Sequence, residues 1–181
     1  MWKWIAILSA IGLHGAGHRI AAGLCGVKLG RIVSSATGLC WQTDRTGFCS
    51  YGKEALVALG GPLGNLLGNA LLILCMPLFP ASDRSAWSML FSSSLFLAIW
   101  NLLPIEGFDG GRILRCLILQ RQREAGTEAA DRTLRISSAI CFTLLWMLSV
   151  YLLLRTGRAF SLFLFCMQLF LGASSAAERN G

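Results

Sequence analysis

A series of long apolar segments, separated by short polar ones, most constrains how this chain can fold. A helix needs roughly 17–25 apolar residues to cross a bilayer, and four segments approach or meet that length, at about residues 4–25, 55–79, 87–103 and 136–154. A fifth, at about residues 159–173, is shorter and spans only if flanking residues help or the bilayer thins. We therefore expect an all-α polytopic membrane protein with about five transmembrane helices.

Composition supports this class. Of the 181 residues, 55% are hydrophobic and 14% are charged, whereas a soluble domain is about 25% charged. The balance excludes a disordered chain and argues against a soluble globular enzyme. The net charge of +7 does not indicate nucleic acid, because the basic residues lie in short loops and form no stripe interleaved with aromatic residues.

The loop charges also predict orientation. With five spans, the first and third loops and the C-terminus share one side and carry eleven Lys and Arg residues, whereas the other side carries four. Cytoplasmic loops are enriched in Lys and Arg. We expect a multi-pass protein of the cell membrane with its N-terminus outside and its C-terminus in the cytoplasm.

Three segments outside the spans have recognisable patterns. Residues 26–52 contain short β-prone pieces at 31–33 and 38–41, which predict a small hairpin after the first span. Residues 110–122 alternate apolar and Arg residues at helical spacing, which favours an interfacial amphipathic helix. The polar residues 124–131 are predicted to be a linker.

The first span contains the two histidines of the chain, His14 and His18. Their i, i+4 spacing places both imidazoles on one helix face, one turn apart, where two ring nitrogens can reach one metal ion. Two alternatives stay open at this point. Histidines that only pack between helices have the same spacing, and the first segment could be a signal peptide, although cleavage after Ala21 or Ala22 would discard both histidines.

The third span ends in a loop with carboxylates. Asn101 precedes Pro104, which should end the helix, and Glu106 and Asp109 follow among glycines that allow a tight turn. The loop is expected on the same side of the membrane as the histidine end of the first span. An ordinary solvated loop is the alternative interpretation.

The second span opens with the residues GGPLGNLLGN, which begin at Gly60. Pro62 suits the first turn of a helix, and Gly64 and Gly68 suit close helix contact. Asn65 and Asn69 are polar residues within this span. A role as hydrogen-bonded packing residues is at least as reasonable for them as contact with a substrate.

Together, these segments resemble the site-2 protease family of intramembrane zinc metalloproteases. The family pattern is HExxH on one span, a GPxxN-like element on the next and NxxPxxxLDG closing the third, and this chain reads HGAGH, GGPLGN and NLLPIEGFDG. The resemblance extends over roughly residues 5–112 and is closest to the compact sporulation-type branch of bacteria. It divides the chain into a three-helix protease core at 1–112 and a region at 113–181 with the interfacial helix, the linker and two further membrane helices.

The resemblance implies a set of roles. His14, His18 and Asp109 would bind Zn²⁺, Asn101 would lie near the scissile peptide, and Asn65 would help to position substrate. The implied substrate is a membrane-embedded or membrane-bound protein, cleaved near the cytoplasmic face, in contact with the lipid bilayer. A regulatory membrane partner also fits the family pattern.

One position departs from the family pattern. Gly15 stands where the family has the glutamate that acts as general base, and loss of a proton-transfer group costs roughly 10²–10⁴-fold in rate. Two interpretations follow: a zinc endopeptidase that is slow or inactivated by this residue, or a pseudoprotease that captures transmembrane segments without cutting them. A displaced base at Glu106 is a third hypothesis. A haem or transport bundle is disfavoured, because histidines one turn apart cannot ligate opposite faces of a haem.

Overall fold

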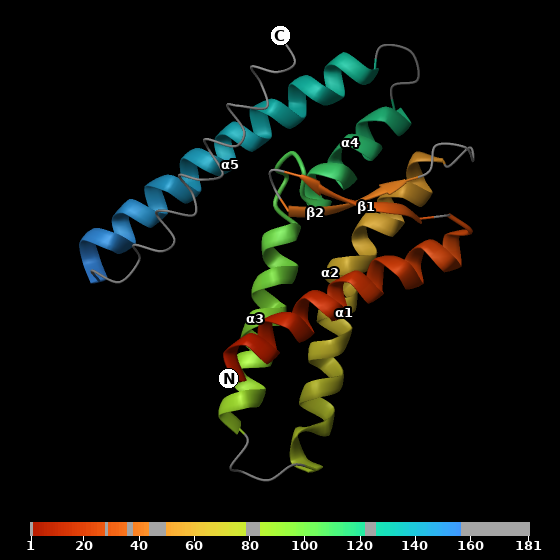
Figure 1. Ribbon diagram of the computed structural model, residues 1–181. Helices are drawn as coiled ribbons and strands as arrows, with labels where there is room; N and C mark the ends of the chain where they lie inside the picture. Colours follow the sequence, from red (N-terminus) through yellow and green to blue (C-terminus); the bar gives the residue numbers. More distant parts are fainter. Residues whose placement is uncertain are drawn as a thin grey trace.

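The computed structural model describes residues 2–27, 29–35, 38–43, 50–78, 84–121 and 126–156. In chain order the elements are α1 (Trp2–Cys25), β1 (Leu29–Ser35), β2 (Gly38–Thr43), α2 (Tyr51–Cys75), η1 (Met76–Leu78, a 3₁₀ turn), α3 (Arg84–Asn101), α4 (Asp109–Arg121) and α5 (Gly126–Thr156) (Figure 1). The predicted helical membrane fold is confirmed. The predicted fifth span, residues 159–173, lies outside the described residues.

Within the described part of the chain, three helical segments are long and apolar enough to cross a membrane: Trp4–Cys25, Tyr51–Leu78 and Gly126–Thr156. The helix α3 has 18 residues, a length of about 27 Å at 1.5 Å per residue. It begins at Arg84 and contains five serines from Ser85 to Ser94, which lowers its apolar character. Its position in the bilayer therefore depends on its packing against α1 and α2.

The predicted hairpin after the first helix is present. The strands β1 and β2 pair antiparallel, with Ile32 opposite Trp41 and Val33 opposite Cys40. An irregularity in the pairing lies between Leu29 and Ile32. The hairpin joins the end of α1 to the start of α2, so both helices reach the same end of the bundle (Figure 1).

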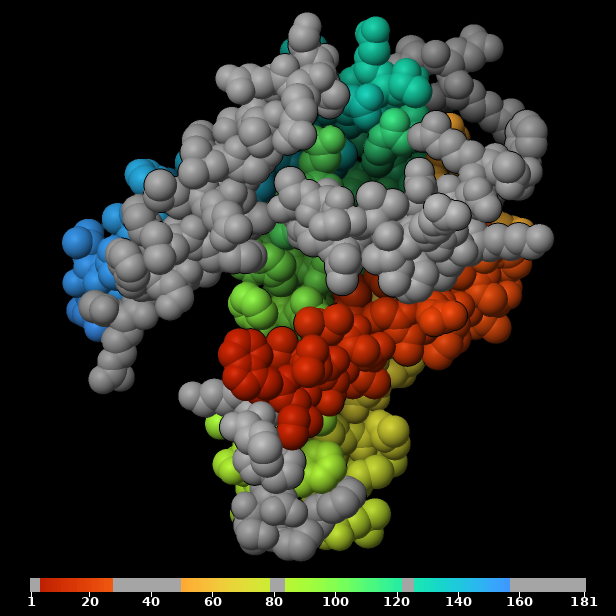
Figure 2. All heavy atoms as spheres, viewed as in Figure 1, coloured from red at the N-terminus to blue at the C-terminus, as the bar shows by residue number. Residues whose placement is uncertain are grey.

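The helices α1 and α2 meet through glycines. A Cβ atom added to Gly60 would lie 2.7 Å from the carbonyl oxygen of Gly17, and one added to Gly64 would lie 2.8 Å from the carbonyl oxygen of Leu13. Figure 2 shows α1, in red, lying across α3 and α2. Small residues let helix backbones approach within a membrane. This contact fixes the level of α1 against α2, and hence the level of its histidines.

The start of α2 differs from the prediction. Pro62 was expected in the first turn, but α2 begins at Tyr51, with Ser50 as its N-cap, and Pro62 lies inside the helix. A proline there cannot donate a hydrogen bond to the carbonyl of Ala58. Both residues are buried against the neighbouring helices. Such packing lets membrane helices accommodate an internal proline.

A short loop connects α3 to α4, and Asp109 is the first residue of α4 after this loop. The helix α3 ends at Asn101, three residues before Pro104, as predicted. Gly107 has a φ of +91°, a conformation that favours glycine. A Cβ atom on Gly110 would collide with the carbonyl oxygen of Leu102. The glycines therefore allow the first turn of α4 to fold directly onto the loop.

The helix α5 supports that loop from the other side. Ser138 Oγ accepts a hydrogen bond from the backbone nitrogen of Glu106 at 2.9 Å, and Ser137 Oγ donates to the carbonyl of Pro104 at 2.8 Å. Ile105 and Phe108 form a small buried cluster against α5. The polar linker predicted at 124–131 is wrong from Gly126 onward, because these residues form the first turns of α5.

Burial follows the pattern expected in lipid. Six polar side chains are buried among the described helices: His18, Asn65, Asn69, Ser94, Ser138 and Ser149. Large apolar side chains such as Leu24, Leu74 and Leu154 are three-quarters or more exposed. In a bilayer, helices bury their polar groups against one another and expose apolar groups to lipid. The described helices therefore have the surface of a membrane protein.

Candidate functional site

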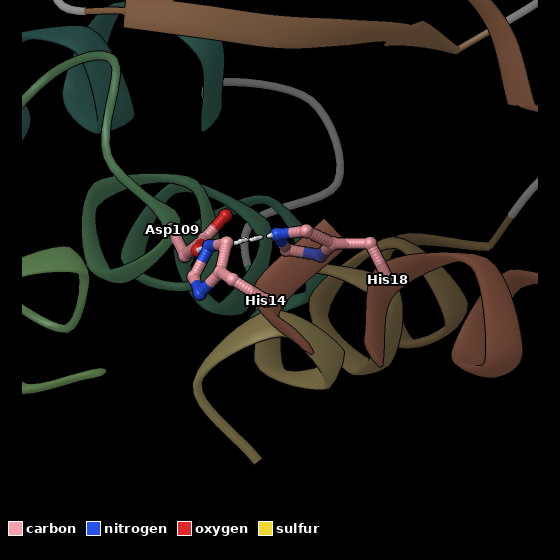
Figure 3. A group of neighbouring side chains, drawn as sticks. All are labelled: His14, His18 and Asp109. Atoms are coloured by element: carbon pink, nitrogen blue, oxygen red, sulfur yellow. Dashed lines mark hydrogen bonds and ion pairs between the residues drawn. The ribbon is translucent and has the colours of Figure 1, made fainter. Parts of the chain in front are cut away.

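The three predicted ligands converge at one place. His14 Nε2 and His18 Nε2 lie 3.0 and 3.4 Å from Asp109 Oδ2, and the two ring nitrogens are 3.2 Å apart. Figure 3 shows the three side chains pointing toward one another. Among the described residues, these three side chains lie close enough to one another to hold a metal ion. Residues from α1 and α4, far apart in sequence, thus share one small volume.

The arrangement of these atoms fits zinc. Ligand atoms roughly 2.0–2.2 Å from a tetrahedral metal are about 3.3 Å apart, and the three observed separations bracket this value. Asp109 Oδ2 is buried without a hydrogen bond of good geometry. Three acceptor atoms this close repel one another unless a proton or a cation lies between them. Two imidazoles and one carboxylate are also the ligand set of a catalytic zinc site with an open fourth position.

Gly61 of α2 keeps this volume open. A Cβ atom at Gly61 would collide with His18 Nε2 and would lie 2.7 Å from His14 Nε2. It would therefore fill the space beside both donor nitrogens. The absence of a side chain at this position is part of the site. Gly61 belongs to the GPxxN-like element, but the sequence did not assign it this role.

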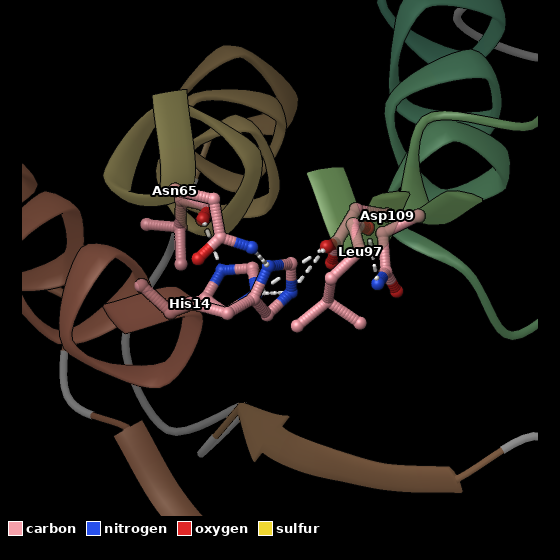
Figure 4. Close-up of polar contacts among 7 residues, drawn as sticks. His14, Asn65, Leu97 and Asp109 are labelled. Atoms are coloured by element: carbon pink, nitrogen blue, oxygen red, sulfur yellow. Dashed lines mark hydrogen bonds and ion pairs between the residues drawn. The ribbon is translucent and has the colours of Figure 1, made fainter. Parts of the chain in front are cut away.

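Each histidine is held through its other ring nitrogen. His18 Nδ1 lies 2.8 Å from the backbone carbonyl of Val57. His14 Nδ1 lies 3.3 Å from the side-chain amide of Asn65 (Figure 4). Such contacts orient metal-ligating imidazoles and set which nitrogen carries the proton. In both rings the contact leaves Nε2 facing Asp109.

The Asp109 carboxylate is held in its charged form. Burial raises its pKa, but the adjacent His14 and His18 lower it more, and the net shift is downward. The position at the first residue of α4 adds the favourable field of a helix N-terminus. A carboxylate that stays ionised in a buried place is suited to binding a cation.

A polar cluster outside the predicted site connects α4 to α2. Arg112 pairs with Glu54 at 3.8 Å, and the Cys116 thiol donates to Glu54 at 3.7 Å. Burial and the charge and hydrogen bond of Glu54 raise the pKa of Cys116 to about 11. Since Arg112 lies one turn after Asp109, the ion pair helps to orient the ligand helix. Sequence reasoning missed this cluster, because nothing in the pattern relates residue 54 to residues 112 and 116.

The other predicted site residues lie close by but make different contacts. Gly15 is on the ligand turn of α1, and a Cβ atom there would meet nothing within 4 Å. Asn101 donates to the carbonyl of Leu97 at 2.9 Å, one turn earlier on α3. Asn65 is completely buried behind His14. Glu106 is exposed on the loop and is not part of the ligand group.

Comparison with known proteins gives a family match and a related protein. Residues 51–145 match the model of peptidase family M50. A zinc metalloprotease of Methanocaldococcus jannaschii is 25% identical over 154 residues, which are 83% of this chain and 44% of that protein. The chain therefore spans less than half the length of this curated relative.

The fold also matches a solved structure. The site-2 protease from Methanocaldococcus jannaschii superposes with a TM-score of 0.63 at 23% identity, over 96% of this chain and 76% of that one. At this identity the likeness shows the fold alone. The family match covers more than half of the 181 residues and includes Asp109. The chain belongs to peptidase family M50, the family of the site-2 proteases.

Proposed function

We propose that this protein is an intramembrane zinc metalloendopeptidase whose turnover is limited by the glycine at position 15. The convergence of His14, His18 and Asp109 on one buried volume carries this proposal. Family membership supports the intramembrane metalloprotease class. The substrate, the cleavage position and the activity of this chain are part of the proposal.

The residues of the site have separable tasks. His14 and His18 would hold Zn²⁺ with neutral imidazoles and Asp109 would hold it with a carboxylate. Zinc supplies Lewis-acid chemistry, which polarises a peptide carbonyl and acidifies water. In the family pattern, a glutamate directly after the first histidine would be the general base, which would accept a proton from the attacking water and return it to the leaving amine. Gly15 has no group for this task, so we expect a rate lower by roughly 10²–10⁴-fold.

The substrate is proposed to be a membrane-embedded or membrane-bound protein. A helical substrate hides its carbonyls in backbone hydrogen bonds, so it must unwind locally to reach the site. Asn101, at the end of α3, is proposed to lie near the scissile peptide. The loop charges favour a site on the cytoplasmic side.

A non-catalytic scaffold is the second candidate, and Gly15 is the observation that favours it. Such a protein would keep the ligand group and the metal and would bind transmembrane segments without hydrolysis. Zinc binding alone does not separate the two candidates. A variant with a carboxylate restored at position 15 separates the endopeptidase from the scaffold.

The test is the Gly15→Glu variant, with Gly15→Gln as a control of equal size that has no base. A Cβ atom at Gly15 meets nothing within 4 Å, so either side chain can be attached there without a clash at its first atom. Purified protein in detergent is incubated with zinc and fluorophore-labelled casein, an unfolded substrate that needs no unwinding. We expect Gly15→Glu to cleave at least about 100-fold faster than the native chain and Gly15→Gln.

Adding Asp109→Ala to the Gly15→Glu variant should abolish the gained activity, because this substitution removes a proposed metal ligand. If Gly15→Glu binds zinc but cleaves no faster than Gly15→Gln, the endopeptidase proposal is wrong and the scaffold becomes the better candidate.

A further inference from the structure

The two histidines have different partners at Nδ1, the ring nitrogen that faces away from Asp109. His18 Nδ1 faces the Val57 carbonyl, which can only accept a hydrogen bond. A neutral His18 must therefore carry its proton on Nδ1, which leaves the lone pair of its Nε2 free. His14 Nδ1 faces the side-chain amide of Asn65, which has both a donor and an acceptor end. Only His14 can exchange one tautomer for the other without losing its partner.

Without a cation, the close contacts at the site require one proton. His14 Nε2 lies 3.0 Å from Asp109 Oδ2 and 3.2 Å from His18 Nε2, and both of these atoms are acceptors. A proton on His14 Nε2 satisfies these contacts. His14 Nδ1 then accepts from Asn65 Nδ2, the amide orientation that the structure shows.

A metal at the site reverses this arrangement. It needs the lone pair of His14 Nε2, so the ring proton moves to Nδ1. An amide nitrogen facing that N–H would oppose two donors in a buried place, which costs roughly 1–3 kcal/mol. A half-turn of the amide brings Asn65 Oδ1, which is buried and without a partner in the described structure, into position to accept.

We propose that Asn65 is a positioning residue for the ligand His14, with its amide oxygen accepting the His14 Nδ1 proton in the metal-bound form and its amide nitrogen donating to Nδ1 in the metal-free form. This inference rests on the proposed zinc site. It differs from the expected contact with substrate, because Asn65 is fully buried and lies behind the ligand.

The test compares variants that keep or remove the acceptor. Asn65→Asp keeps an acceptor, and Asn65→Leu has a similar size but none. Asn69 is the matched control one turn along α2, because its Nδ2 donates to the carbonyl of Phe91 rather than to a histidine ring. The probe is Co²⁺, titrated against a competing chelator into full-length protein in detergent, with its visible spectrum as the readout.

We expect Asn65→Leu to bind Co²⁺ about 10–100-fold more weakly, as is typical when the outer partner of a ligand is removed. Asn65→Asp should remain within a few-fold of the native affinity or exceed it, and Asn69→Leu should match the native chain. Native affinity in Asn65→Leu, or equal weakening in Asn65→Asp, would overturn the inference. Failure of the folded native chain to bind Co²⁺ would instead refute the metal site itself.

A second readout does not depend on affinity. The chain has two histidines, so ¹⁵N-histidine labelling of the zinc-loaded protein gives at most two Nδ1–H signals. Hydrogen-bonded Nδ1–H protons exchange slowly with water and remain visible. We expect two such signals in the native chain and in Asn65→Asp, and only one, from His18, in Asn65→Leu. Two protected signals in Asn65→Leu would contradict the inference.

Discussion

At the scale of single residues, Gly61 shows how a site can depend on an absent side chain. The space beside its Cα is bounded by the donor nitrogens of both histidines. An added methyl group forces the rings apart, and overpacking of this kind costs roughly 1–3 kcal/mol. The effect should appear in metal binding, because the rings are the groups that must move.

We therefore expect Gly61→Ala to lower Co²⁺ affinity by about 5–150-fold, the equivalent of that cost at 1.4 kcal/mol per tenfold. Gly12→Ala is the control, because a Cβ atom there meets nothing within 4 Å. Chelator competition measures the affinity, and thermal unfolding of the metal-free proteins shows whether the fold is retained. Equal affinities of Gly61→Ala and Gly12→Ala would show that the space is not needed.

The proposed ligands follow from the sequence at this scale, whereas the groups that support them do not. Spacing on one helix pairs His14 with His18, and the motif closing the third apolar segment supplies Asp109. The Val57 carbonyl has no signature in sequence, because every residue carries the same backbone acceptor. Gly61 resembles its neighbour Gly60 in sequence, and only the packing shows that one faces α1 backbone and the other faces the imidazoles.

At the scale of elements, α5 has a part that its sequence did not reveal. The sequence predicts it only as a further membrane helix, yet Ser137 and Ser138 hold the backbone of the loop that carries Asp109. Serine in a membrane helix has many uses, such as the bond of Ser149 to the carbonyl of Trp146 in its own helix. The sequence therefore gives no reason to connect α5 with the site.

The double variant Ser137→Ala/Ser138→Ala should loosen the loop and lower Co²⁺ affinity by about tenfold, because two bonds worth roughly 0.5–1.5 kcal/mol each are lost. Thr143→Ala is the control, since Thr143 donates only to Ala139 of its own helix. The same chelator competition measures the effect. An unchanged affinity in the double variant would mean that the loop keeps its shape without α5.

Some helix boundaries could be predicted from the sequence and others could not. Pro104 and the glycines after it correctly predicted the end of α3 and the tight loop. Pro62 misled the prediction, because a proline at a helix start and one inside a buried membrane helix look alike in sequence. The residues from Gly126 look like a linker by polarity, but their side chains lie on α5 before its apolar part begins.

At the scale of the whole molecule, the orientation of the chain in the membrane stays a prediction from the sequence. The count of eleven basic residues against four predicts that the segment between α3 and α5 lies on the cytoplasmic side. Alkaline phosphatase folds only outside the cytoplasm, so fusions truncated at two sites report the orientation. We expect a fusion after residue 82 to be active and one after residue 123 to be inactive. The reverse pattern would place the metal site on the outer side of the membrane.

The contact of Gly17 with Gly60 and Gly64 also has an evolutionary consequence. Main-chain atoms set the spacing between α1 and α2, so the lipid-facing side chains of these helices can drift without moving the histidines. A larger residue at any of the three glycines instead displaces a whole helix. Selection on such a site therefore acts strongly on a few of its smallest residues and weakly on most of its surface, and overall identity is a poor guide to whether the centre survives.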